Sequence, residues 1–106
     1  MRKKLGRRRV VLLTLSDRIA ALFRQLMREH YPDARADVVQ EYDGNDRLQD
    51  AAGSADVFIV NTFDAKHAAT LAVPKSRPTS APTLYPKGKN AARQLDALEE
   101  WLRSLA

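Results

Sequence analysis

The chain of 106 residues contains no cysteine, which excludes disulfide bonds and thiolate chemistry. Its two histidines, His30 and His67, lie far apart and have no second ligand at a zinc-site spacing, so we expect no metal site. No apolar run approaches the about 20 residues that a membrane helix needs. No apolar segment with a cleavage site follows the charged N-terminus. We therefore expect a cytoplasmic protein with no membrane partner.

Three glycine-containing catalytic and cofactor motifs are also missing. No Gly-x-Gly-x-x-Gly follows the first apolar segment, which disfavours NAD and FAD, and no Gly-x-Ser-x-Gly marks a hydrolase nucleophile. The sequence Gly88-Lys89-Asn90 is not a Walker motif, because neither the preceding glycine nor a following serine or threonine is present. These absences leave no established catalytic motif and no certain cofactor.

The positive charge is concentrated at the N-terminus. The net charge is +5, from 18 basic and 13 acidic residues. Removing the basic residues of positions 1–9 leaves 12 basic residues against 13 acidic ones, so the remainder is nearly neutral. We expect residues 1–8 to form a flexible basic arm and residues 9–106 to form one domain. The basic side chains of this terminal segment are Arg2, Lys3, Lys4, Arg7, Arg8 and Arg9.

This arm could neutralise phosphates of RNA or DNA without sequence preference. It contains no aromatic residue for base stacking, so base recognition is not supported. Two alternatives remain open: a solvated terminus that only aids solubility, and an arm that docks an acidic protein partner or a second copy.

Strand and helix patterns alternate along the rest of the chain. Apolar or β-branched runs predict strands at 9–15, 36–42, 56–61 and 83–85, the second of them at an edge of the sheet. Helical spacing and caps predict helices at 17–30, 46–52, 65–73 and 91–105, with Gly53 ending the second. The order predicts an α/β, Rossmann-like, three-layer domain with a four-stranded parallel sheet, strand order 2-1-3-4.

Three loops are expected to meet at the carboxyl edge of this sheet. The first runs from Thr14 to Arg18 and holds Ser16 and Asp17, the second runs from Asn61 to His67, and the third is 87–90. Each leads into a helix, whose free amides and positive dipole favour an anion. The candidate ligand-binding residues are Ser16, Asp17, Thr62, His67, Lys87, Gly88 and Lys89. The simpler interpretation of the third loop is a turn at Gly88 with Asn90 as a helix cap.

His67 is the candidate catalytic residue, since a histidine at this edge could contact a ligand or transfer a proton. Its structural alternative is a hydrogen bond to Thr62 or Asp64. Asp17 and Asp64 could face each other as a magnesium or general-base pair, although helix capping alone would explain either of them.

The segment from about 55 to 98 resembles an uncharacterised group of small bacterial Rossmann-like domains. The likeness lies in a strand followed by Thr62, four residues, and His67 at a helix start, and then in a glycine turn at Gly88. The resemblance implies a compact Rossmann-like fold with a ligand site and no assigned reaction. It also implies a link to bacterial defence genes. Lys87 and Lys89 replace the more serine-rich turn of that group, which favours a more anionic ligand.

We therefore interpret the chain as a small module that binds a nucleotide or a nucleic-acid phosphate. It would be a non-catalytic component of a larger bacterial system, for which the resemblance implies an association with defence. Two alternatives stay open. One is a phosphoester- or nucleotide-processing enzyme that uses His67 with Asp17 or Asp64, and the other is a protein-interaction subunit.

Overall fold

The described part of the chain forms a parallel sheet with helices on both faces. The computed structural model describes residues 8–40, 46–61, 82–86 and 90–104. The helix predicted at 65–73 lies outside these residues. The strands are β1 (Arg9–Leu13), β2 (Arg35–Val39), β3 (Val57–Val60) and β4 (Thr83–Leu84), and the helices are α1 (Asp17–His30), α2 (Asp46–Ser54) and α4 (Ala91–Ser104).

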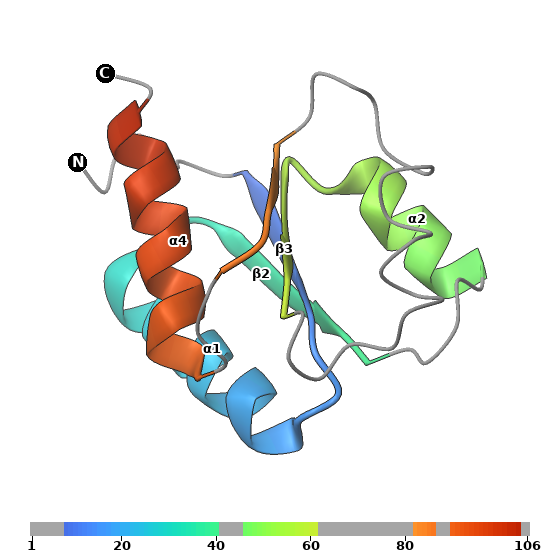
Figure 1. The fold of residues 1–106 in the computed structure, drawn as a ribbon, viewed down its shortest axis with the longest axis horizontal. Coiled ribbons are helices and arrows are strands. Elements are labelled where there is room, and N and C mark those ends of the chain that lie inside the picture. The colour runs from blue at the N-terminus through green and yellow to red at the C-terminus, as the bar shows by residue number, and fades with distance from the viewer. Residues whose placement is uncertain (1–7, 41–45, 62–81, 87–89, 105–106) are drawn as a thin grey trace.

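All four strands run parallel in the order β2-β1-β3-β4, which confirms the predicted α/β topology. Figure 1 shows α1 and α4 on one face of the sheet and α2 on the other. Among the described strands, β2 and β4 form the two edges, and the edge position predicted for the second strand is confirmed.

The central strands β1 and β3 are apolar on both sides because each side faces a helix layer. Val10 and Leu12 contribute to the core beneath α1 and α4, whereas Val11 and Leu13 contribute to the core beneath α2. The strand β3 alternates in the same way: Val57 and Ile59 serve the first core, and Phe58 and Val60 serve the second. This double burial explains the absence of apolar–polar alternation in the sequence.

The first helix has the bounds that the sequence predicts. Ser16 caps its start, and the amide of Tyr31 donates to the carbonyl of Met27 at 2.7 Å where it ends. Its buried side chains, Ala20, Phe23 and Met27, lie at helical spacing.

The second helix continues beyond the predicted stop at Gly53. The amide of Ala55 donates to the carbonyl of Ala51 at 3.0 Å, so the helical hydrogen-bond pattern passes through the glycine. The hydroxyl of Ser54 donates to the carbonyl of Asp50 at 2.9 Å and satisfies one of the last acceptors. The helix therefore ends at Ser54. The side chain of Ser54 caps the helix end, a role that the sequence predicts for Gly53.

Two helices that are distant in sequence are joined through a polar contact above the core. Tyr31 is 5% exposed, and its hydroxyl donates to Glu99 Oε2 on α4 at 3.1 Å. This bond lies beside the apolar contact between α1 and α4 and fixes the C-terminal end of α1 against α4.

Substitution of Leu98 with alanine tests the core beneath α1 and α4. Leu98 is fully buried on α4, so its removal leaves a cavity, and we expect Leu98→Ala to cost about 2–5 kcal/mol of unfolding free energy. Denaturant unfolding would measure this loss. Leu22→Ala is the matched control, because Leu22 is 42% exposed and its replacement should cost much less. Equal losses for the two variants would contradict the assigned core.

Candidate functional site

The carboxyl ends of β1 and β3 carry two buried polar residues. Thr14 directly follows β1, Asn61 directly follows β3, and neither side chain is exposed. The Nδ2 atom of Asn61 donates to Thr14 Oγ1 across 3.4 Å. The amide of Asn61 also donates to the carbonyl of Leu13 at 2.9 Å. The two central strands thus end in a shared hydrogen-bonded pair at the topological switch point, where α/β sheets bind ligands.

Ser16 connects this pair to the start of α1. Its amide donates to Thr14 Oγ1 at 3.3 Å, and its own hydroxyl oxygen accepts from the amide of Ile19 at 3.2 Å. Its backbone is extended, with φ −91° and ψ 118°, which is the usual geometry of an N-cap. The carbonyl of Ser16 accepts from the amide of Ala20 at 3.0 Å.

Two further amides at this helix start, those of Asp17 and Arg18, have no acceptor in the described part of the chain. An anion would find hydrogen-bond donors and the positive end of the helix dipole here.

The carboxylate of Asp17 is directed toward the β2 side of this edge. Gln40, the first residue after β2, donates from Nε2 to Asp17 Oδ1 at 2.9 Å. Since β2 and β3 lie on opposite sides of β1, this bond draws the carboxylate away from Asn61. Both side chains of this pair are exposed.

Of the predicted ligand-binding residues, the structure describes Ser16 and Asp17. Both lie at the carboxyl end of β1, beside the switch point between β1 and β3. The other predicted residues lie outside the described part of the chain, as does Asp64, and their meeting with Ser16 stays a prediction. These residues are Thr62, His67, Lys87, Gly88 and Lys89.

Asn90, in contrast, is described, and it caps a helix. Its Oδ1 accepts from the amide of Arg93 at 2.9 Å at the start of α4. The cap interpretation given to Asn90 above is confirmed. Gln94, one turn further along, is fully buried and donates from Nε2 to the carbonyl of Asn90 at 3.4 Å.

The last two arginines of the basic segment contact the domain; Arg2, Lys3, Lys4 and Arg7 lie outside the described residues. Arg9 begins β1, and its Nε lies 2.9 Å from Asp37 Oδ2 on β2. The Nη1 atom of Arg9 also donates to the hydroxyl of Ser54. The guanidinium of Arg8 lies 5.9 Å from the centre of the Trp101 ring.

Grooves in the described part of the chain include two that Ser16 does not line. One, of about 970 Å³, lies between β4 and α4, and the other, of about 490 Å³, lies between β2 and α2. Arg9, Asp37 and Arg47 line the second.

The sequence places Thr14 and Asn61 in two of the converging loops but gives them no ligand-binding role, and it does not single out Gln40. Each is the first polar residue after a run that forms a strand, and this position is the signal that could have identified them. For Gln94 the sequence offers no such signal, because a glutamine at an interior position of an amphipathic helix is ordinarily exposed.

Neither a metal-binding group nor a membrane-spanning helix is found among the described residues. These contain no group of three or more histidine, aspartate or glutamate side chains able to hold a metal ion. Nor does the described part of the chain include a helix with the length and apolarity required to span a bilayer.

The parallel sheet in the order 2-1-3-4, with its polar switch point, defines a small Rossmann-like α/β protein. Within this class the chain belongs to the DpdD-like family, whose profile matches residues 1–97. This match covers the first half of the chain as well as the second, and the motif of Thr62, His67 and Gly88 described above stays a prediction. No curated protein and no solved structure gives a significant match.

Replacement of Ser16 tests the cap at the centre of the candidate site. Ser16→Ala removes the acceptor for the Ile19 amide, and we expect a loss of about 1 kcal/mol in unfolding free energy. Ser16→Asn should restore most of it, because asparagine caps helices as well as serine does. Denaturant unfolding would measure both variants. An Ser16→Ala protein as stable as the unchanged chain would show that the cap contributes nothing.

Proposed function

We propose that this chain is a small nucleotide- or nucleic-acid-phosphate-binding module, and a non-catalytic component of a larger bacterial system of the defence type. Its ligand would lie at the carboxyl edge of the sheet, beside β1 and β3. The proposed domain spans residues 9–106, with a basic arm at residues 1–8, and the proposed location is the cytoplasm.

The observation that carries this proposal is the start of α1 at the switch point. Ser16 holds the helix start against Thr14, and the amides of Asp17 and Arg18 have no acceptor among the described residues. A phosphate oxygen accepts hydrogen bonds from such amides and is favoured by the helix dipole.

Neutral groups flank this helix start on the β3 side. Asn61 and Thr14 are an amide and a hydroxyl, and neither carries a charge that would repel a phosphate. Among the described residues at this helix start, the negatively charged side chain of Asp17 is hydrogen-bonded to Gln40 on the β2 side. An anion between β1 and β3 would therefore be separated from the carboxylate.

The remaining binding groups in this proposal come from residues outside the described part of the chain. Thr62 and Ser16 would each donate a hydroxyl hydrogen bond to the ligand, and Lys87 and Lys89 would neutralise phosphate charge around Gly88. His67 would orient the ligand. The support for these roles is their position in the sequence, after β3 and β4, whose carboxyl ends share an edge with that of β1.

The family supports the part of the proposal that makes this chain a component of a larger system. Membership of the DpdD-like family fits a component of a defence-type system, and phosphate binding goes beyond what membership provides. The basic arm would supply a second, non-specific contact to RNA or DNA.

Calorimetry with single nucleotides and with short RNA and DNA, each at two salt concentrations, tests this function. We expect His67→Ala and Lys89→Ala to weaken nucleotide binding about tenfold, which corresponds to about 1.4 kcal/mol. Arg28→Ala removes one exposed positive charge at the opposite end of α1 and should leave the affinity unchanged.

The arm is tested separately by replacing Arg2, Lys3, Lys4 and Arg7 with glutamine. This variant should bind single nucleotides normally, whereas its affinity for RNA or DNA should fall and depend less on salt.

Absence of nucleotide binding, or nucleotide binding that neither His67→Ala nor Lys89→Ala changes, would exclude the proposed site.

A further inference from the structure

The groove between β4 and α4 combines an edge of the sheet, as the described strands form it, with aromatic and acidic side chains. It measures about 970 Å³, and Tyr85, Asp96, Glu100 and Trp101 are among its lining residues. Among the described strands, β4 pairs only with β3. A further extended segment could therefore pair with the outer edge of β4, as occurs when peptides add to sheets.

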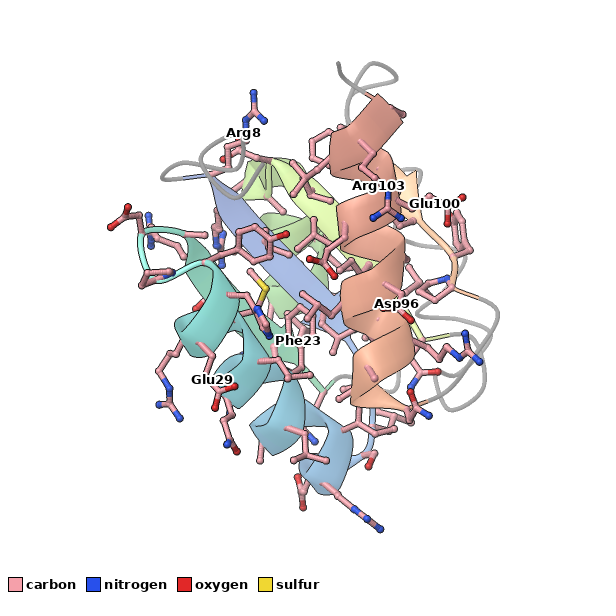
Figure 2. The ribbon with its side chains drawn as sticks, turned by 90° about the vertical axis from the view of Figure 1, so that its left-hand side faces the viewer. Arg8, Phe23, Glu29, Asp96, Glu100 and Arg103 are labelled. Atoms are coloured by element: carbon pink, nitrogen blue, oxygen red, sulfur yellow. The ribbon has the colours of Figure 1, made fainter. Side chains whose placement is uncertain are left out.

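The α4 side of the groove favours a cationic occupant. Asp96 and Glu100 are one helical turn apart and exposed, and Figure 2 shows both projecting from α4 on the side of β4. Arg93 lies 4.0 Å from Asp96, but both side chains are about two-thirds exposed, so this ion pair is weak. A cation that contacts both Asp96 and Glu100 would compete with Arg93 for the carboxylate of Asp96.

The chain itself places a cation beside Trp101, one of the residues that line this groove. The guanidinium of Arg8 lies 5.9 Å from the centre of the Trp101 ring, within the range of a cation–π interaction. Figure 2 shows Arg8 near the C-terminal end of α4. The described chain begins at this residue, so residues 1–7 precede a residue that lies beside Trp101, and Trp101 lines the groove.

The composition and length of residues 1–7 match the groove. They contain four basic residues (Arg2, Lys3, Lys4 and Arg7) and no acidic one. Seven extended residues reach about 23 Å. The helix rises about 12 Å from Trp101 to Arg93, so the segment is long enough to pass both carboxylates.

We propose that the groove between β4 and α4 binds the basic arm of the same chain, with Asp96 and Glu100 pairing with its lysines and arginines and Trp101 holding Arg8. This docking withholds the arm from other acidic partners until they displace it. The inference does not depend on phosphate binding at Ser16, because Ser16 lies at the carboxyl end of β1 and Arg8 at its amino end.

Trp101 is the only tryptophan of the chain and therefore reports on its own groove. The test titrates a synthetic peptide with the sequence of residues 1–9, which contains no tryptophan, into two full-length proteins and follows Trp101 fluorescence. One protein is unchanged, and in the other Arg2, Lys3, Lys4 and Arg7 are glutamine. We expect the neutralised chain to bind the peptide at least tenfold more tightly, because its groove is vacant.

The acidic residues are tested in the chain with the neutralised arm. Asp96→Asn together with Glu100→Gln should weaken peptide binding about tenfold. The matched control, Glu29→Gln with Asp50→Asn, removes the same charge from exposed positions on α1 and α2 and should change the affinity less than twofold. Far-UV circular dichroism would establish that each variant is folded.

Three outcomes would overturn the proposal. Equal affinity of the peptide for both arm versions would show that the arm does not occupy the groove and that the groove serves another segment. If Glu29→Gln with Asp50→Asn weakened peptide binding as much as the groove variant does, the weakening would come from the overall charge of the protein and not from Asp96 and Glu100. Peptide binding without a change in Trp101 fluorescence would place the peptide elsewhere.

Discussion

Burial of the central strands on both faces is the constraint on which the rest of this structure depends. The side chains of β1 between Val10 and Leu13, and all those of β3, have no exposed surface. Such strands need a helix layer on each side, and the amphipathic α1, α2 and α4 provide these layers. Polar groups that serve a ligand are thereby excluded from the sheet interior and confined to the strand ends.

The two ends of the sheet differ in chemistry. At the amino end, the amide of Arg9 donates to Asp56 Oδ2 at 2.8 Å, and the side chain of Arg9 pairs with Asp37. At the carboxyl end, the corresponding central contact joins the uncharged groups of Thr14 and Asn61. One ion pair and one bond from a backbone amide to a carboxylate therefore hold the amino end together, whereas the uncharged Thr14 and Asn61 stand where α/β sheets place their ligands. This polarity supports a site at the carboxyl end independently of the net charge of the chain.

The fold was predictable because its signals are local. Uninterrupted apolar runs predict buried parallel strands, Ser16 predicts the start of α1, and alternation of strands with helices restricts the topology. The contacts that connect these elements were not predictable, since they depend on pairs far apart in sequence. Tyr31 and Glu99 are separated by 68 residues, and Asn61 and Thr14 by 47. The sequence therefore locates the candidate site by strand ends, whereas its hydrogen-bonded interior required the structure.

The basic N-terminal segment shows that a charge count overstates the number of cations that are left for an external partner. The sequence presents six equivalent cations, but Arg9 belongs to β1 and pairs within the domain, and Arg8 lies against Trp101. The cations left for an external partner are those before Arg8. In the two proposals above, these same residues would contact either a nucleic acid or the carboxylates of α4, and one set of side chains cannot neutralise both at once. Nucleic-acid binding through the arm would therefore have to release it from α4, so the measured affinity would contain the cost of that release.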